Sequence, residues 1–103
     1  MYKIFRTSSF KKDYKKLNAK EKELIKTVIT KLANEEELEE KYKDHNLIGN
    51  YLGCRECHVK PDLLLIYRID NDILELALVR VGSHSKLFWA IEVFKDNKTL
   101  DDE

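Results

Sequence analysis

The chain has 103 residues, 43% hydrophobic and 37% charged, which gives enough apolar side chain for the core of one domain. No apolar run reaches the roughly 18 residues that span a bilayer, and the first residues lack a signal-peptide core, so we expect a cytoplasmic protein. The net charge of zero hides a basic block over residues 1–31, with ten Lys or Arg against three Asp or Glu, balanced by acidic blocks over 32–44 and 89–103. A basic block of this kind is usually a solvated helix surface, although it can also bind phosphates.

The first third of the chain predicts a strand followed by two helices. Alternating residues, several of them β-branched or aromatic, favour a strand over residues 2–7. Ser8 or Ser9 can cap a first helix, in which apolar residues recur at i, i+4 and i+7. Asn18 and Glu21 have the spacing of a capping box and precede a second amphipathic helix. We expect the lysines to cover the outer face of this helical hairpin.

Three strands are expected in the second half of the chain, over residues 54–59, 63–69 and 73–81. The near-continuous apolar run of the middle strand is typical of a central strand that is buried on both faces. Gly49 and Gly53 mark a turn-rich connection, residues 35–42 are either a short helix or an acidic loop, and residues 70–72 form a tight turn. Ser83 can start a short terminal helix. The order β-α-α-β-β-β predicts an α+β fold with two helices packed on an antiparallel sheet.

The segment from Cys54 to His58 matches the C-x-x-C-H pattern of covalent haem attachment. We reject that interpretation because the chemistry belongs to exported proteins, and because a strand would place Cys54 and Cys57 on opposite faces. The same geometry argues against a redox pair, which places its first cysteine at a helix N-terminus. A zinc site would need His45 and His58 to replace the missing half of the pattern. We therefore expect Cys57 to be a small core residue.

The three histidines of the chain each lie in a short motif with charged neighbours. They are His45, His58 and His84. Histidine can take up or release a proton near neutral pH. On the strand over 54–59, Glu56 and His58 share one face and Arg55 points to the other. A carboxylate beside an imidazole orients the ring and stabilises its protonated form, although a surface ion pair without function is the commoner case.

Further polar residues fall at the ends of the predicted strands. Asp62 follows Pro61 at the bend into the central strand, beside the face of His58. Arg80 lies near the end of the last strand, four residues before His84, so both can reach the same end of the sheet. Phe88 lies one helical turn beyond His84, where it either packs in the core or stacks on a base.

Cleavage of RNA requires groups of these kinds. The ribose 2′-OH must lose a proton to attack the adjacent phosphate, and the leaving 5′-oxygen must gain one. The phosphorane between these states carries extra negative charge that a cation can stabilise. Two histidines, or a histidine and a carboxylate, can transfer the protons and an arginine can supply the charge. No metal or other cofactor is required.

Taken together, these motifs resemble the RelE/ParE superfamily of bacterial toxins, and most closely its YafQ-type branch of ribosome-dependent mRNA interferases. The matching positions are Tyr42-Lys-Asp-His45, Leu47, Gly49, Arg55-Glu-Cys-His-Val59, Pro61-Asp62, Leu65-Ile-Tyr67, Arg80, Gly82-Ser-His84 and Leu87-Phe88. The order of elements agrees with that fold over residues 1–88, which we take as the toxin domain. Residues 89–103 would be an extension of the same domain or a tail.

The resemblance implies a toxin of a type II toxin–antitoxin pair that cuts mRNA in the ribosomal A site. It places five residues on the family's catalytic positions: His45, His58, Asp62, His84 and Phe88. Glu56 stands where the branch often has an aspartate. His84 is the best candidate for the general acid, with His58 or His45 as the base. Asp62 is an orienting partner or an alternative base.

The resemblance also implies substrate contacts and partners. Arg80, with Arg55 as a second candidate, would stabilise the phosphorane, and Phe88 would position the base. A cognate antitoxin would cover this surface, and operator DNA would be bound only by the toxin–antitoxin complex. Two alternatives stay open: a ParE-like toxin that binds gyrase, and a homologue that only binds the antitoxin. Histidines in all three motifs argue against the ParE-like reading, because that branch does not depend on such a set.

Overall fold

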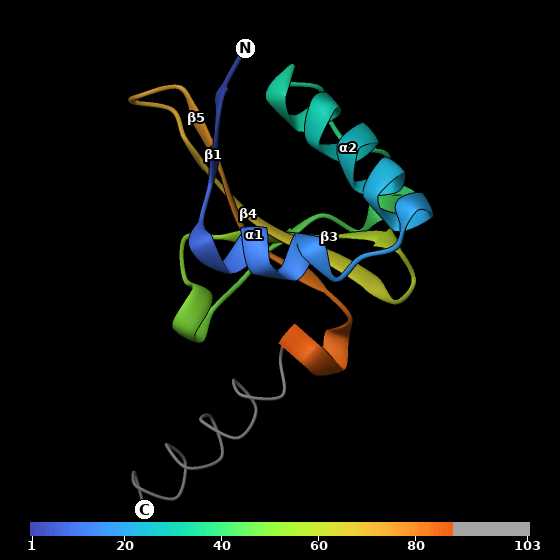
Figure 1. Cartoon of the computed structure of the whole chain (residues 1–103). Helices are drawn as coiled ribbons and strands as arrows, with labels where there is room; N and C mark the ends of the chain where they lie inside the picture. Colours follow the sequence, from blue (N-terminus) through green and yellow to red (C-terminus); the bar gives the residue numbers. More distant parts are fainter. Residues whose placement is uncertain (88–103) are drawn as a thin grey trace, which may run out of the picture.

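The computed structural model describes residues 1–87 (Figure 1). The elements are β1 (Lys3–Arg6), α1 (Ser8–Lys15), α2 (Ala19–Ala33), η1 (Glu40–Tyr42), β2 (His45–Asn46), η2 (Gly49–Tyr51), β3 (Arg55–Lys60), β4 (Leu63–Asp70) and β5 (Glu75–Gly82), where η marks a 3-10 helix. Residues 84–87 are helical, and Ser83 caps them by accepting a hydrogen bond from the Lys86 backbone at 3.2 Å. The predicted α+β class is confirmed. The two-residue strand β2 was not predicted, and residues 35–42 form a loop that ends in η1.

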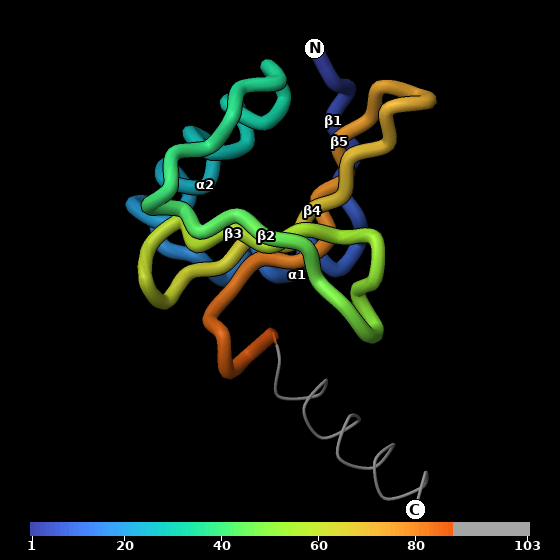
Figure 2. Tube along the Cα trace, turned by 180° about the vertical axis from the view of Figure 1, so that it is seen from behind, coloured from blue at the N-terminus to red at the C-terminus, as the bar shows by residue number. Residues whose placement is uncertain are grey.

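The five strands form one sheet in the order β1-β5-β4-β3-β2. Strands β2 to β5 are antiparallel to their neighbours, whereas β1 runs parallel to β5. Figures 1 and 2 both show β1 lying beside β5. The prediction of an antiparallel sheet is therefore wrong for β1. Antiparallel neighbours can be joined by a tight turn, but β1 and β5 are joined through the rest of the chain, so no turn sets their direction.

Helix α1 begins one residue earlier than the sequence predicted. Thr7, rather than Ser8 or Ser9, is its cap: the hydroxyl accepts a hydrogen bond from the Phe10 backbone at 3.0 Å. The same hydroxyl lies 3.0 Å from the carbonyl oxygen of Leu78, to which it donates. Thr7 has the extended backbone that a cap needs, and its second bond fixes the start of α1 to strand β5.

The two helices cover one face of the sheet, which we call the helix face. The predicted capping box is present at the start of α2. The Glu21 backbone N–H donates to Asn18 Oδ1 at 2.8 Å, and the Asn18 backbone N–H donates to Glu21 Oε1 at 3.0 Å. The core on this face consists of Phe10, Ile25, Val28, Leu32, Ala33, Tyr42, Cys57, Val59, Leu63, Leu65, Tyr67, Leu76, Leu78 and Val81. Strand β4 is buried on both faces, as predicted, with residues 63–67 at most 1% exposed.

The opposite face of the sheet, which we call the site face, has a smaller apolar cluster. Its buried members are Cys54, Leu64, Ile66 and Leu87. Neither α1 nor α2 contributes a buried residue to this cluster, so polar side chains of β2, β3 and β5 can remain accessible on the same face.

The hairpin between β4 and β5 has a longer turn than predicted. Ile73 and Leu74 were expected in the strand, but both lie in the turn and are more than half exposed. Asp70 accepts a hydrogen bond from the Asp72 backbone at 3.0 Å, and Leu74 has a left-handed φ of 51°. The side chain of Asp70 therefore closes the turn locally, and β5 starts at Glu75.

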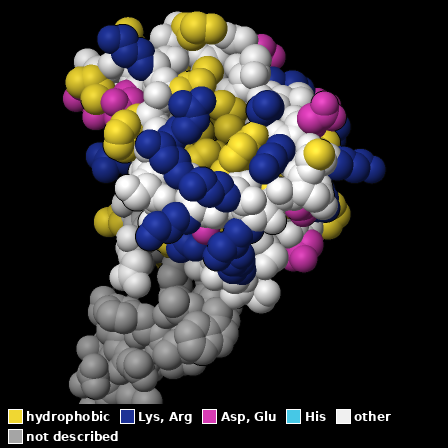
Figure 3. All heavy atoms as spheres, in the orientation of Figure 1, with side chains coloured by type: hydrophobic (Ala, Val, Ile, Leu, Met, Phe, Trp, Pro, Cys, Tyr) yellow, Lys and Arg dark blue, Asp and Glu magenta, His cyan; other side chains and the backbone are white. Residues whose placement is uncertain are grey.

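Lysine and arginine side chains gather on the surface formed by β1, α1 and α2 (Figure 3). They surround an exposed apolar patch in a groove lined by Ile4, Arg6, Phe10, Lys11, Tyr14, Lys15, Lys26, Ile29 and Thr30. The predicted basic outer face of the helical hairpin is therefore present. In residues 1–87, no helix is long and apolar enough to cross a membrane.

Candidate active site

Strand pairing places four of the predicted site residues in two adjacent rows across the sheet. The first row consists of His45, Glu56, Ile66 and Arg80, and the second of His58, Leu64 and Gly82. Cross-strand partners project to the same face, which here is the site face. Because neighbouring strands lie about 4.8 Å apart, the Cα atoms of Glu56 and Arg80 are about 10 Å from each other. Two imidazoles, a carboxylate and a guanidinium therefore share one surface.

A β-bulge brings Arg80 to this surface. Tyr67 pairs with Leu78 and Ile66 pairs with Arg80, so Val79 is an extra residue in β5. A strand without the bulge would place Arg80 on the same face as Leu78, which is the helix face. The bulge shifts the alternation by one residue and brings Arg80 to the site face. The sequence suggests no such irregularity, because the run from Glu75 onward reads as a regular strand.

Glu56 lies between the two histidines and is the buried centre of the site. Its Oε1 is 3.5 Å from Nε2 of His45 and 3.5 Å from Nε2 of His58, and the ring centroids are 6.4 Å apart. The Glu56 side chain is 6% exposed, whereas those of His45 and His58 are 50% and 28% exposed. A buried carboxylate needs nearby polar partners, and the two imidazole rings lie on either side of this one. We call these three residues the His–Glu–His cluster.

The ring of His45 has a defined orientation. Its Nδ1 lies 2.7 Å from the carbonyl oxygen of Lys43. Because a carbonyl can only accept, Nδ1 carries a proton, and in the neutral ring the lone pair is on Nε2. That lone pair is on the nitrogen nearest Glu56. His45 can therefore accept a proton at Nε2, and the Glu56 carboxylate would stabilise the imidazolium that results.

Arg80 is held by an aspartate that sequence analysis did not identify. Asp13 of α1 accepts hydrogen bonds from Arg80 Nε at 2.6 Å and Nη2 at 3.1 Å, and from the Val81 backbone at 3.1 Å. Hydrogen bonding to Asp13 is the largest cause that raises the pKa of Arg80, and a bond to Tyr51 adds to it. Asp13 is the only acidic residue of the lysine-rich α1. This isolated carboxylate among lysines is the sequence feature from which its role could have been predicted.

Arg55, the second predicted phosphorane ligand, lies on the helix face, away from the His–Glu–His cluster. Its guanidinium donates to Asp44 at 2.9 Å and to Asn46 at 2.7 Å, and Tyr67 donates its hydroxyl to the same aspartate. The bond to Asp44 is the main cause that raises the pKa of Arg55. Because Asp44 directly precedes His45, this network fixes β2 against β3 and thereby positions His45.

Asp62 and His84 lie at the end of the sheet where β5 finishes. Asp62 is exposed in the turn between β3 and β4, and it lines a pocket together with Gly82 and Ser83. His84 is exposed two residues beyond Gly82, at the start of the helical residues 84–87. Phe88 and the extension over 89–103 lie outside the described residues.

Cys54 and Cys57 belong to different faces of the sheet, as predicted. Cys54 is in the apolar cluster of the site face and Cys57 is in the core of the helix face. Burial raises the pKa of the Cys57 thiol to about 12, so it stays protonated at neutral pH. Within residues 1–87, no group of three or more His, Cys, Asp or Glu side chains could hold a metal ion.

Comparisons with known proteins place the chain in a family. The family described as "Bacterial toxin of type II toxin-antitoxin system, YafQ" matches residues 2–89. The mRNA interferase toxin YafQ of Escherichia coli K12 is 35% identical over 85 residues, which are 80% of this chain and 90% of that protein.

Two solved structures show the same similarity. A metal-bound toxin from Helicobacter pylori has a TM-score of 0.74 and 45% identity, covering 85% of this chain and all of that one. YafQ in the E. coli DinJ–YafQ toxin–antitoxin complex has a TM-score of 0.73 and 34% identity, covering 84% of this chain and 97% of that one. The chain therefore belongs to the YafQ family of bacterial toxins of type II toxin–antitoxin systems.

Proposed function

We propose that this protein is an mRNA interferase, an endoribonuclease that cuts mRNA in the ribosomal A site and is neutralised by a cognate antitoxin. The observation that carries the proposal is the buried Glu56 carboxylate, which lies 3.5 Å from Nε2 of both His45 and His58. The name of the E. coli relative, mRNA interferase toxin, and the DinJ–YafQ complex support the activity and the kind of partner. The protein would act where ribosomes translate, in the cytoplasm.

The proposed reaction is a transesterification within the RNA strand. The 2′-oxygen attacks the adjacent phosphorus and gives up its proton to a general base. The bond from phosphorus to the 5′-oxygen then breaks, and that oxygen takes a proton from a general acid. The products are a 2′,3′-cyclic phosphate and a 5′-hydroxyl, with no net gain or loss of protons.

His45 fits the role of the base. Its Nδ1 proton is bound by the Lys43 carbonyl, so Nε2 of the neutral ring can take the 2′-OH proton. Glu56, whose Oε1 lies 3.5 Å from that nitrogen, then stabilises the imidazolium through its negative charge. His58 contacts the same carboxylate, so it is the second candidate for this role.

The acid and the phosphorane ligand would come from the opposite side of the site. His84 follows the end of the second row, and we assign it as the general acid, with Asp62 as an orienting partner or alternative base. Arg80 would stabilise the phosphorane, since Asp13 keeps its guanidinium charged and in place. Phe88 would position the base of the substrate. These side chains supply both proton transfers and the charge, so the proposed step uses no metal.

Cleavage of a translated message tests the proposal. Wild-type toxin and the His84→Ala variant are added to ribosomes that carry mRNA, and primer extension maps the ends. We expect cuts in the A-site codon with the wild type and a rate roughly 10²–10⁴-fold lower with the variant. Toxin that has been stripped with EDTA and returned to magnesium buffer should cleave like untreated toxin. Intact messages with the wild type, or equal cleavage by the variant, would contradict the proposal.

A further inference from the structure

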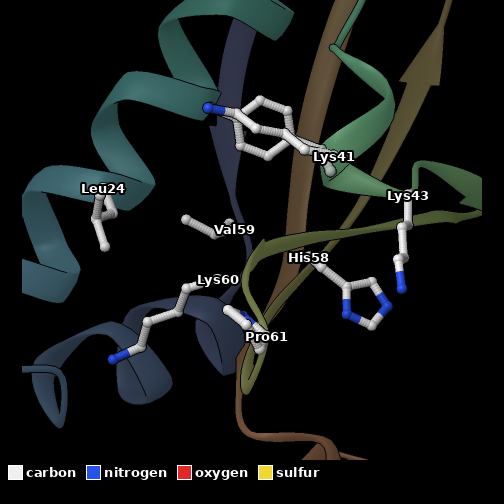
Figure 4. A pocket seen from close by; sticks show the side chains of 8 residues that line it. Leu24, Lys41, Lys43, His58, Val59, Lys60 and Pro61 are labelled. Atoms are coloured by element: carbon white, nitrogen blue, oxygen red, sulfur yellow. The ribbon is translucent and has the colours of Figure 1, made fainter.

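A groove runs along the outer edge of β3, next to the His–Glu–His cluster. This β3 groove is lined by Leu24, Lys41, Tyr42, Lys43, His58, Val59, Lys60 and Pro61 (Figure 4). It exists because β2 pairs only with Arg55 and Glu56, so that η1 and α2 stand beside the rest of the β3 edge. Its volume of about 550 Å³ lies in the range of pockets that hold small ligands, about 300–1,000 Å³.

The β3 groove combines positive charge with an apolar wall. Lys41, Lys43 and Lys60 supply three ammonium groups, and none of the residues that line the groove is acidic. Lys60 is paired with Glu21 at the rim, with 3.3 Å between Nζ and Oε2, so Lys41 and Lys43 supply the positive charge that this ion pair does not hold. The ammonium of Lys41 lies 5.2 Å from the centroid of the Tyr42 ring. The side chains of Leu24, Tyr42, Val59 and Pro61 form the apolar wall. This chemistry suits a ligand that has a flat apolar group and a phosphate.

Two residues join the β3 groove to the acid–base groups. His58 lines the groove, and its Nε2 is 3.5 Å from Glu56. Lys43 also lines the groove, and its carbonyl oxygen holds the Nδ1 of His45. Lys43 adopts a left-handed φ of 48°, which is uncommon for residues other than glycine, and Figure 4 shows its side chain on the same side of β3 as the His58 ring. A ligand in the groove therefore lies against His58, next to the rest of the His–Glu–His cluster.

We propose that the β3 groove binds one nucleotide of the RNA next to the cleaved phosphate, with the base against the apolar wall and a phosphate beside Lys41 and Lys43. The inference rests on the proposed function, because it takes the ligand to be part of the same RNA strand. Single-stranded RNA is recognised by just such contacts to an unstacked base and its phosphate. An acidic segment of the antitoxin could also bind the lysines, but binding of the antitoxin would not require the groove to adjoin His58, whereas binding of the cleaved RNA does.

The test combines a double variant with modified RNA. Lys41→Gln/Lys43→Gln is compared with wild type and with Lys3→Gln, which removes a lysine on β1 at the other edge of the sheet. Single-turnover cleavage is measured on ribosome-bound mRNA that is intact or abasic at one position flanking the cut. We expect the double variant to need roughly tenfold more toxin for half-maximal rate, with the maximal rate unchanged, because it loses binding rather than chemistry. The control should behave like wild type.

The abasic RNAs identify the nucleotide in the β3 groove. At one flanking position, loss of the base should slow the wild type by roughly tenfold and slow the double variant little further, because the two changes remove coupled contacts. Wild-type rates for the double variant, or independent losses at every position, would overturn the inference.

Normal cleavage with weakened binding of the cognate antitoxin would overturn the inference and assign the groove to the antitoxin. A wild type that leaves messages intact would overturn the proposed function itself. Thermal melting of each variant verifies its fold, and the abasic RNAs test the wild type without any substitution.

Discussion

The two faces of the sheet use the same strands for different purposes. On the helix face, α1 and α2 cover a continuous apolar core, and the charged Arg55 and Asp44 are bound to each other. On the site face, the apolar cluster is small, and His45 and His58 remain within reach of solvent around the buried Glu56. Because adjacent residues of one strand serve opposite faces, stability and chemistry should be separable by single substitutions. Changes on the helix face should lower stability, and changes on the site face should lower cleavage.

The largest effect in this comparison is expected for Asp13→Asn, because Asp13 lies on α1 but holds Arg80 of the site face and so links the two faces. The substitution weakens two hydrogen bonds that hold Arg80, and a displacement of that guanidinium by about 1 Å would slow cleavage by about 10²-fold. Stability should fall by about 2 kcal/mol, since bonds to a charged group are lost. Single-turnover cleavage and urea denaturation measure the two effects.

Asp13 is a positioning residue, so its conservative variant is informative. Asp13→Glu keeps the carboxylate and should recover part of the cleavage rate that Asp13→Asn loses. Asp72→Asn makes the same chemical change in an exposed turn and serves as the control. If Asp13→Asn lowers stability but cleaves like wild type, Arg80 does not depend on Asp13 for its role in the reaction.

Arg55→Ala should have a smaller effect, and mainly on stability. Arg55 is partly exposed, so the loss of its bonds to Asp44 and Asn46 should cost about 1 kcal/mol, or about 4 °C in melting temperature. Cleavage by the folded protein should change only a few-fold, through looser positioning of His45. Arg68→Ala, at an exposed position of β4, is the matched control. A loss of cleavage as large as that of Asp13→Asn would show that Arg55 takes part in the chemistry, as the sequence first suggested.

The effect expected for Cys57 is confined to alkaline pH and absent at neutral pH. Burial raises the pKa of its thiol from 9.0 to about 12 in the folded protein. Below pH 9 both states keep the proton, whereas between pH 9 and 12 the unfolded chain loses it first. Stability should therefore fall with rising pH in that window, by up to about 1.4 kcal/mol per pH unit from this group. The decline should be shallower in Cys57→Ala, whatever its stability at pH 7. Equal slopes in urea denaturation would contradict the assignment.

Sequence analysis anticipated those parts of the site that follow from local periodicity. Alternation along β3 placed Glu56 and His58 together and Arg55 opposite them, and the capping box located the start of α2. Two features could not be read in this way. The bulge at Val79 depends on pairing with β4, and it reverses the face of Arg80. Contacts between distant segments, such as Asp13 with Arg80, have no local pattern.

Strand β2 was missed for a related reason. It is two residues long, too short for any periodicity, and it is held by the side chains of Asp44 and Arg55 as much as by strand pairing. The motif around His45 was nonetheless recognised by resemblance. Its geometry, with Nδ1 bound to the Lys43 carbonyl, became apparent only from the structure.

In the proposed reaction, His45 removes the 2′-OH proton and His84 protonates the 5′-oxygen. The most direct test replaces that oxygen with sulfur at the cleavage site of ribosome-bound mRNA. A thiol has a pKa of about 8.5, far below that of an alcohol, so a thiolate leaves without a general acid. We predict that the sulfur substrate restores cleavage by His84→Ala to nearly the wild-type rate and leaves His45→Ala slow. Rescue of both variants, or of neither, would contradict the assignment of His45 as the base and His84 as the acid.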